Sequence, residues 1–532
     1  MSVFIFSWRA ILLALGAIYA LRWLWLETSH SRRARQLGCK QAFKRPSKWP
    51  LGIDILMRYT RTTHEQIQQI DDLVLYEELG KRATWHQSIL GNGHYMTVDP
   101  KNVQALLTTQ FKDFELGPNR YGVFAPLIGK GIFTSDGKEW EHSRALLRPQ
   151  FSRSKVADLE LDERHVQALL GRLTPVAGSW TQTVDMAPLF FHLTLDTSTE
   201  FLFGQSVHSQ RMTGPGLETH GTTKGLQWAS FGRSFDDANL VVTIRSRLMD
   251  FYWLYAPRSF HRDCNDVQRF AEYYIQLALA GNSPNGGTTA AKEGNAADKE
   301  GYVFLEELVK LTRDPEELRG QLLNILLAGR DTTAGLLGWT FYLLARHPDV
   351  YTKLRTAILD QFGPYKSSTE NVSFERLKSC SYLQHVMSEA LRLHPIVPEN
   401  GRRAVRNTTL PRGGGPDGAS PIYVRAGTEV AYNVHIMHRR TDIWGPDAAV
   451  FKPERWLHHK AGWEYLPFNG GPRICLGQQF ALTEAGYTIT RIVQKFDRLE
   501  NMDPSTIEKG RFTSTTSPVN VLVRLHEAPS QQ

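Results

Sequence analysis

The chain has 532 residues, of which 41% are hydrophobic and 22% charged, a balance typical of globular proteins rather than disordered ones. Its formal net charge of +8 is modest, and no nucleic-acid-binding motif accompanies it, so we expect no nucleic-acid partner. Its four cysteines are too few and too scattered for a disulfide framework, which argues against a disulfide-stabilised secreted domain: Cys39, Cys264, Cys380 and Cys475.

The N-terminus has the pattern of a membrane anchor. Residues 3–26 are almost wholly apolar or aromatic, and as a helix they would reach about 36 Å, enough to cross the hydrocarbon of a bilayer. Residues 27–50 carry an excess of basic side chains, which predicts a cytosolic location for everything that follows. A cleaved signal peptide is the alternative, but Trp25 and Leu26 make a poor cleavage site. We therefore predict a single-pass anchor, a basic proline-containing linker over 27–50 and one catalytic domain over 51–532.

The predicted domain is mainly helical with small sheets. Two short segments, 93–98 and 421–431, have the composition of strands. Residues 281–301 are rich in Gly, Asn, Ala and Lys, which is typical of a surface loop. Apolar residues recur at three- and four-residue spacing, as on one face of a helix, over 161–203, 303–312, 315–345, 349–361 and 374–393.

The helix expected over 315–345 has recognisable ends. Asp314 is a suitable N-cap, Pro315 fits the first helical position, and Glu317 has the spacing of a capping box. Pro348 would end the helix. Such a helix would be about 45 Å long and would cross the whole domain.

The middle of that helix reads Ala-Gly-Arg-Asp-Thr-Thr, residues 328–333. Gly329 costs roughly 1 kcal/mol relative to alanine, so a functional reason for it is expected, such as close approach of oxygen or substrate to the backbone. Asp331 and Thr332 form an acid–alcohol pair that is able to move protons. The alternative is an aspartate that faces solvent and a threonine bonded to its own helix.

Two further residue pairs share one helix face. Glu389 and Arg392 are three residues apart, and Trp140 and Arg144 four. By themselves such pairs are usually found on the surface, where an ion pair contributes under about 1 kcal/mol.

The most informative segment is Phe-Asn-Gly-Gly-Pro-Arg-Ile-Cys-Leu-Gly, residues 468–477. A lone cysteine in a glycine-rich turn cannot build a closed zinc site, which needs three or four close ligands. Cys475 can present a single thiolate to one face of a planar metal cofactor. An isolated cysteine is otherwise most often a small buried apolar residue.

This segment resembles the haem-ligand signature of the cytochrome P-450 family of haem-thiolate monooxygenases, and four further segments resemble that family in the same order. The resemblance implies the cytochrome P-450 fold preceded by a membrane-anchor helix. It also implies haem b as cofactor, with the Cys475 thiolate as axial ligand of the iron.

The resemblance further implies roles for individual residues. The Glu389–Arg392 pair would be a buried structural lock against residues 453–456. The proton relay would be Asp331 and Thr332. The haem would be held by Cys475, Trp140, Arg144, Arg402, Arg473, Phe468 and Gly477, and the substrate pocket would include Ala328, Gly329, Thr333, Val397 and Glu399.

Several stretches are similar to the fungal branch of the family that hydroxylates alkanes and fatty acids, among them Phe-Lys-Asp-Phe at 111–114 and Arg-Pro-Gln-Phe at 148–151. The implied reaction inserts one oxygen atom from O2 into a C–H bond of a lipophilic long-chain aliphatic substrate: a fatty acid, an alkane or a polyketide-like chain. The implied electron donor is NADPH–cytochrome P-450 reductase at the endoplasmic reticulum membrane.

The segment Glu-Asn-Gly-Arg at 399–402 departs from that branch, which commonly carries an apolar and an aromatic residue before the arginine. Glu399 therefore favours a rival function, that of a tailoring oxidase of secondary metabolism acting on a more polar substrate. A family member that rearranges peroxides without a reductase is also conceivable, but retention of Asp331 and Thr332 argues against it. A haem-binding sensor or scaffold without turnover would be a non-enzymatic function, and the intact set of motifs argues against that.

Overall fold

The structure is a computed structural model that describes residues 8–152, 155, 157–211, 222–223, 226–281, 302–366 and 369–529. The loop predicted over 281–301 lies, after Gly281, outside the described residues, as do residues 3–7 of the predicted anchor.

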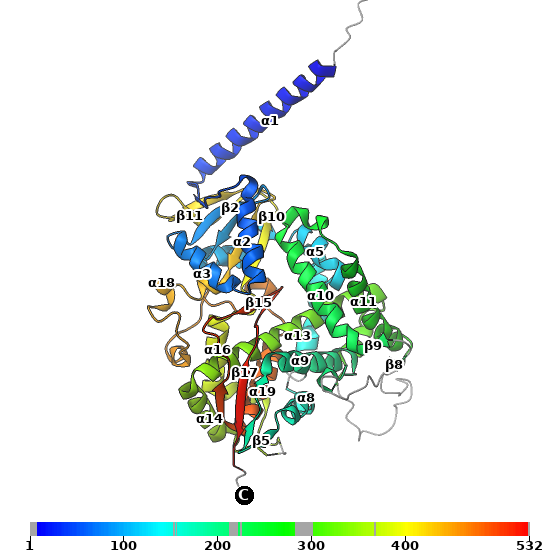
Figure 1. Cartoon of the computed structure of the whole chain (residues 1–532). Coiled ribbons are helices and arrows are strands. Elements are labelled where there is room, and N and C mark those ends of the chain that lie inside the picture. Colours follow the sequence, from blue (N-terminus) through cyan, green and yellow to red (C-terminus); the bar gives the residue numbers. More distant parts are fainter. Residues whose placement is uncertain are drawn as a thin grey trace, which may run out of the picture.

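Helices make up most of the fold, as expected from the periodicity (Figure 1). Their bounds are α1 Trp8–Gln36, α2 Ile53–His64, α3 Gln68–Glu78, α4 Pro100–Gln104, α5 Pro118–Ile128, α6 Gly137–Leu147, α8 Glu160–Arg172, α9 Met186–Phe203, α10 Trp228–Arg247, α11 Arg258–Leu279, α12 Phe304–Val309, α13 Pro315–Arg346, α14 Pro348–Phe362, α15 Phe374–Ser379, α16 Ser381–Leu393, α17 Val434–Met437, α18 Thr441–Trp444 and α19 Gln478–Lys495.

The strands form small sheets at the edges of the helical body. The largest has the order β1-β2-β3-β13-β10-β4, and the next is β14-β17-β6-β5 with β7 beside β17. Three two-stranded sheets pair β11 with β12, β15 with β16 and β8 with β9. The bounds are β1 Phe43–Lys44, β2 Thr84–Ile89, β3 Asn92–Thr97, β4 Phe114–Glu115, β5 Pro175–Ala177, β6 Trp180–Thr181, β7 Val184–Asp185, β8 Thr222–Thr223, β9 Leu226–Gln227, β10 Glu399–Ala404, β11 Thr408–Gly414, β12 Ser420–Val424, β13 Glu429–Asn433, β14 Phe496–Asn501, β15 Gly510–Phe512, β16 Thr516–Pro518 and β17 Leu522–Glu527.

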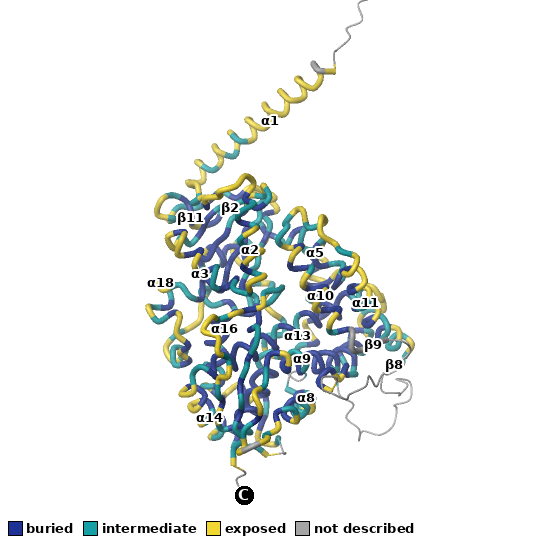
Figure 2. Tube along the Cα trace, in the orientation of Figure 1, coloured by how far each residue is buried: buried dark blue, intermediate teal, exposed yellow. Residues whose placement is uncertain are grey.

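Helix α13 is the central helix of the molecule. Its 32 residues span about 48 Å, and most of them are buried on every side, in contrast to the exposed α1 (Figure 2). One apolar cluster lies where α13 packs with α9, α14, α16 and α19, and a second where it packs with α5, α10, α11 and α12. A third cluster lies under the six-stranded sheet, so α13 joins two helical cores and the sheet completes a separate lobe.

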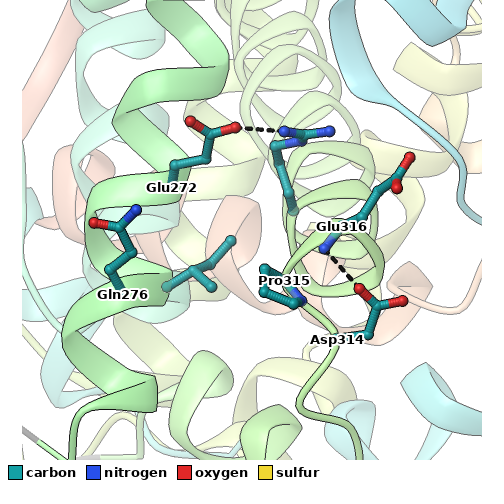
Figure 3. Close-up of a pocket in the computed structure, with 7 residues that line it drawn as sticks. Glu272, Gln276, Asp314, Pro315 and Glu316 are labelled. Atoms are coloured by element: carbon teal, nitrogen blue, oxygen red, sulfur yellow. Dashed lines mark hydrogen bonds and ion pairs between the residues drawn. The ribbon is translucent and has the colours of Figure 1, made fainter.

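The N-terminal end of α13 is capped as the sequence indicates, but without the capping box. Asp314 accepts a hydrogen bond from the backbone of Glu316 at 3.0 Å (Figure 3). The Glu317 carboxylate instead accepts from Thr312 at 2.6 Å and pairs with His142 at 2.7 Å. This end also borders an open surface hollow of about 420 Å³, lined by α11 and α13 and distant in sequence from the segments predicted to form the active site (Figure 3).

Three predicted segments are divided in the structure. The pattern over 161–203 covers both α8 and α9, because a hairpin with Gly178 and Ser179 at positive φ separates them. The predicted strand over 421–431 is the end of β12 and the start of β13, joined by a turn at Gly427, whose φ is +82°. The pattern over 374–393 is interrupted at Cys380, between α15 and α16.

Helix α1 continues well beyond residue 26, into the segment predicted as a linker (Figure 1). From Ile11 onward it is long and apolar enough to cross a membrane, and none of its most apolar window is buried. Its C-terminal part is tied to the sheet lobe. Glu27 pairs with both terminal nitrogens of Arg425, at 2.6 and 2.8 Å, and His30 bonds to the Tyr423 hydroxyl at 3.1 Å.

Candidate active site

Cys475 lies in a tight loop that leads into α19. The backbone amide of Cys475 donates to the Phe468 carbonyl at 3.1 Å, which closes the loop around the side chain. Gly471 has a φ of +68°, and a Cβ there would lie 1.9 Å from the Leu107 carbonyl oxygen. The glycine-rich sequence is therefore required, because only glycine has both the conformation and the space.

The Cys475 side chain keeps accessible surface, yet the protein around it raises the pKa of the thiol. The backbone amide of Gly477 and the charge of Arg144 act in the opposite direction and favour the thiolate. Cys264 and Cys380 are buried and Cys39 is half-buried, so none of them has this setting.

Trp140 and Arg144 lie on α6 beside this loop, as their spacing predicts. Trp140 is buried, and the Arg144 guanidinium donates to the Ile474 carbonyl at 3.0 Å. The Arg473 guanidinium lies 4.4 Å from the Trp140 ring and pairs with Asp136 at 2.6 Å. One indole ring thus orders two cations next to the cysteine.

Arg402 completes this group together with a residue that the sequence analysis missed. Arg402 is 2% exposed, donates to the Gly401 carbonyl at 2.7 Å and leaves its buried Nε without a partner. Arg120, on α5, donates to the Asn400 side chain at 2.8 Å. Nothing in the sequence around Arg120 distinguishes it from a surface arginine, because only the packing of α5 against β10 brings it here.

These four arginines, Arg120, Arg144, Arg402 and Arg473, carry more positive charge than their surroundings balance. Burial, together with the other three cations, lowers the pKa of Arg473 to about 10 despite Asp136. Burial and Arg402 lower the pKa of Arg120. Among the described residues, Asp136 is the one carboxylate within 4 Å of the group. A ligand that carries carboxylates of its own would balance the charge.

One face of α13 lines open space although the helix is otherwise buried. Ala328, Gly329 and Thr332 keep accessible surface, whereas Thr333 is 1% exposed and does not contribute to this face. The Thr332 hydroxyl donates to the Ala328 carbonyl at 2.6 Å. A Cβ at Gly329 would lie 3.1 Å from the Ser198 hydroxyl, so the glycine also allows α9 to pack closely.

Asp331 is buried, so the alternative in which it faces solvent is wrong. It accepts from the Asn239 amide at 3.1 Å and pairs with Arg330 at 3.2 Å. Burial raises the pKa of Asp331 to about 6, although the cation of Arg330 opposes the shift. Arg330 in turn reaches Asp236, a half-exposed carboxylate on α10. The acid next to Thr332 is therefore linked to the protein surface through one guanidinium.

Val397 and Glu399 lie in the segment that passes α13 and enters β10. The neighbouring Ile396 approaches α13 at Gly335, where a Cβ would be 3.2 Å from its methyl group. Val397 and Glu399 both keep some accessible surface. Burial raises the pKa of the Glu399 carboxyl, and among the described residues that carboxyl has no hydrogen-bond partner.

The Glu389–Arg392 pair is fully buried and acts as the predicted lock. The two side chains share two hydrogen bonds of 2.8 Å. Glu389 also accepts from the Trp456 indole at 3.1 Å, and Arg392 donates to the Ala448 carbonyl at 2.6 Å. The pair thereby fixes α16 to residues 448–456, as the resemblance implies.

Comparisons with known proteins show the family and the fold of the chain. A sequence model of the family described as cytochrome P450 matches residues 49–523. The chain is 48% identical over 480 residues to "Cytochrome P450 monooxygenase g430" of Fusarium sp, which covers 90% of this chain and 83% of the relative. It is 49% identical over 431 residues to "Cytochrome P450 52A13" of Debaryomyces hansenii, with 81% and 80% covered. The chain belongs to the cytochrome P450 family.

A solved structure described as the cytochrome P450DA heme domain has the same fold. The TM-score is 0.72 at 22% identity, and the match covers 92% of this chain and 98% of that one. The predicted cytochrome P-450 fold is thereby confirmed.

The cofactor of this family is haem with a cysteine thiolate as axial ligand, and this cytochrome P450 is a monooxygenase. The residues present fit that group. The Cys475 sulfur is accessible, a cluster of arginines lacks partners for its charge, and a largely apolar helix face keeps accessible surface. A haem carries two propionates, which match the unbalanced arginines.

Proposed function

We propose that this cytochrome P450 hydroxylates a long-chain aliphatic substrate, with Cys475 as the haem ligand and Thr332 at the site of reaction. The observation that carries the proposal is the accessible face of α13, where Ala328, Gly329 and Thr332 offer a mainly apolar surface with one hydroxyl. Such a face suits a hydrocarbon chain, which gains free energy from burial alone. The similarity to "Cytochrome P450 52A13" of Debaryomyces hansenii supports the choice of branch.

When bound, haem supplies the activation of O2 and the transfer of one oxygen atom to a C–H bond. The other oxygen atom leaves as water, so each turnover needs two electrons and two protons. Trp140, Arg144, Arg402 and Arg473 hold the cofactor through its carboxylates, and we add Arg120 to this set. Phe468 and Gly477 shape the loop that directs the Cys475 sulfur.

The protons are delivered by Asp331 and Thr332. With a pKa near 6, Asp331 exchanges a proton readily around neutral pH, and Arg330 connects it to the half-exposed Asp236. The Thr332 hydroxyl is the last group of the relay, because it lies on the accessible face whereas Asp331 is buried.

The electrons come from NADPH–cytochrome P-450 reductase at the endoplasmic reticulum membrane. Helix α1 supports this location, since it has the length and apolarity of a membrane anchor. The basic residues that follow its apolar part favour a cytosolic catalytic domain, where the reductase would meet it.

A second candidate function is oxidation of a more polar substrate in secondary metabolism. Glu399 favours it, because a carboxyl group without a partner beside the proposed pocket offers a hydrogen bond to a functional group of the substrate. The similarity to "Cytochrome P450 monooxygenase alt2" of Alternaria solani, 42% identical over 508 residues, is compatible with either function.

The two functions are separated by substrate screening of the haem-loaded protein with reductase, NADPH and ¹⁸O₂. The proposal predicts one ¹⁸O atom in the product of an alkane or a fatty acid, detected by mass spectrometry. Turnover confined to functionalised polyketide-type acids would favour the second function. Oxidation without reductase or NADPH would refute the proposed electron supply.

A further inference from the structure

Asn239 is a buried residue of α10 whose side-chain amide forms two hydrogen bonds to distant segments. It is 3% exposed. Its Nδ2 donates to Oδ2 of Asp331 at 3.1 Å, and its Oδ1 accepts from the Ser514 hydroxyl at 2.8 Å. Asp331 belongs to α13, and Ser514 to the turn between β15 and β16. Asn239 thus joins the acid of the proposed proton relay to the turn of a hairpin.

These two bonds fix the orientation of the Asn239 amide. An amide has one oxygen that accepts and one NH2 group that donates, whereas an ionised carboxylate only accepts. If the amide were reversed, its oxygen would face Oδ2 of Asp331 and the two acceptors would repel each other. The Ser514 hydroxyl donates to the amide oxygen and thereby stabilises the orientation that suits the carboxylate.

Asp331 is held at both of its carboxylate oxygens. Oδ1 accepts from Arg330 at 3.2 Å, and Oδ2 accepts from Asn239. Arg330 also reaches Asp236, so its charge is shared between two carboxylates. Burial raises the pKa of Asp331 and Asp236 adds to this effect, whereas Arg330 and Arg511 and the bond from Asn239 lower it. The Asn239 amide is therefore a neutral donor that favours the ionised acid.

Ser514 is held in place because its hairpin packs on α13 near the centre of the molecule (Figure 1). The backbone amide of Thr516 on β16 donates to the Ile396 carbonyl at 2.8 Å. A Cβ at Gly335 would lie 2.7 Å from the Thr516 carbonyl oxygen, so the hairpin and the helix are in direct contact. Gly335 is three residues from Thr332, which puts the two on the same side of α13. The hairpin thus reaches α13 within one helical turn of Thr332.

We propose that Asn239 and Ser514 are positioning residues of the proton relay, which hold the carboxylate of Asp331 in a single orientation. Both act through Asp331: Asn239 gives a hydrogen bond to the charged form, and Ser514 keeps the Asn239 amide turned toward it. Without this bond the acid retains Arg330 but binds its proton more tightly. The inference rests on the proposed function, because it adds residues to the proton delivery assigned there to Asp331.

The first test reads the protonation of Asp331 directly and without substrate. Infrared difference spectra of the haem-loaded protein are recorded as a function of pH, and the carboxyl band that is missing in Asp331→Asn is assigned to this residue. In wild type the band should titrate with a midpoint of about 6. Asn239→Leu keeps a similar size but has no hydrogen-bonding group, so we expect the midpoint to rise by about one pH unit.

The second test concerns the bond from Ser514. Ser514→Ala leaves the Asn239 amide free to reverse, so the midpoint should rise, by less than in Asn239→Leu. Ser514→Thr keeps a hydroxyl and should titrate as wild type does. Ser246→Ala on α10 is the matched control, because the Ser246 hydroxyl bonds to the Val242 carbonyl of its own helix at 2.9 Å. A side chain that only supports packing would neither shift the midpoint nor be replaced by another hydroxyl.

The third test measures the ratio of product to NADPH consumed at pH 7, with the substrate found in the ¹⁸O₂ screen. We expect this ratio to fall about threefold in Asn239→Leu, because the acid gives up its proton less readily. The dissociation constant of the substrate, measured by spectral titration, should stay that of wild type.

An unchanged midpoint in both Asn239→Leu and Ser514→Ala would overturn the inference, and so would an equal shift in Ser514→Ala and Ser514→Thr. Failure of the proposed function is a different result. A raised midpoint with an unchanged ratio of product to NADPH would support the positioning of Asp331 and overturn the proton delivery that the proposed function assigns to it.

Discussion

Thr332 combines two properties that the sequence could only present as alternatives. Its hydroxyl donates to a carbonyl of its own helix, yet the residue keeps accessible surface on the face of α13 that we assign to the reaction. The internal bond holds the hydroxyl oxygen in place, and its lone pairs remain available to accept a hydrogen bond. The two interpretations are thus compatible.

We expect Thr332→Ala to consume oxygen and NADPH while releasing mainly hydrogen peroxide, because the protons needed to complete the reaction arrive at the wrong position or too late. The measurement is the ratio of product to NADPH consumed, which should fall about tenfold or more. Thr352→Ala is the control, since Thr352 makes the same bond to its own helix at 2.9 Å but is exposed on α14. Normal coupling in Thr332→Ala would remove this residue from the relay.

Individual site residues differed in how far the sequence could predict them. Cys475 was recognisable as a candidate ligand because its spacing to neighbouring glycines is local, and the structure shows why Gly471 cannot be replaced. Arg120 and Asn239 were not recognisable, because each is an ordinary polar residue that gains a role only through contacts between distant segments. The contact of Asn239 with Ser514 is hidden from the sequence for the same reason.

At the scale of elements, the buried Glu389–Arg392 pair joins α16 to residues 448–456. Removing one partner of such a pair leaves an uncompensated charge in the interior, which typically costs about 3–5 kcal/mol. We therefore expect Arg392→Met to yield little folded, haem-loaded protein. The measurement is the amount of haem-containing monomer after size-exclusion chromatography.

Lys353→Ala serves as the comparison for that variant, because Lys353 pairs with Glu454 on the surface of the same region. It should be produced at wild-type levels. Equal yields of Arg392→Met and wild type would show that the buried pair is not needed for folding.

The contact between α8 and α19 predicts how the stability of the fold depends on pH. Asp162 on α8 and Glu484 on α19 are buried near each other, and burial raises the pKa of both carboxyls. A carboxyl with a raised pKa in the folded state stabilises the fold while it is protonated. That contribution is complete below the unfolded pKa of about 4 and is lost as the pH rises through the folded value.

Glu484→Gln keeps the shape and removes the ionisation, so it should stabilise the protein more at pH 8 than at pH 5. Each unit by which the pKa has moved corresponds to about 1.4 kcal/mol. Urea unfolding at the two pH values measures the difference, with Glu370→Gln in the loop before α15 as the control for a carboxyl away from this pair. A larger gain at pH 5 would contradict the assignment.

Element ends were predictable where a local signal exists. Asp314, Pro315 and Pro348 mark the ends of α13 and the start of α14 correctly, because caps and prolines act within a few residues. The capping box failed, since Glu317 has better partners in Thr312 and His142. The segment over 173–185 between α8 and α9 was missed because the apolar spacing continues on both sides of it.

At the scale of the whole molecule, α1 is one straight element that extends from its apolar segment to the sheet lobe (Figure 1). The bonds of Glu27 to Arg425 and of His30 to Tyr423 fix its end against that lobe. The sequence predicted the apolar segment, since hydropathy is additive along the chain. It did not predict the rigid connection, which depends on residues far apart in the chain.

We expect a chain without residues 1–36 to remain in the supernatant after membrane sedimentation and still to bind haem, because the three apolar cores lie outside α1. The full chain should sediment with membranes and resist extraction at high salt. Sedimentation of the truncated chain to the same extent would mean that another surface provides the attachment.

The most direct test of the whole account is the absorption spectrum of the reduced protein under carbon monoxide. With the Cys475 thiolate as axial ligand, wild type and Cys39→Ser should both show the strongly red-shifted Soret band of a thiolate-ligated haem, and Cys475→Ser should lack it. A red-shifted band that persists in folded, haem-loaded Cys475→Ser, or that is absent from wild type, would contradict the central claim.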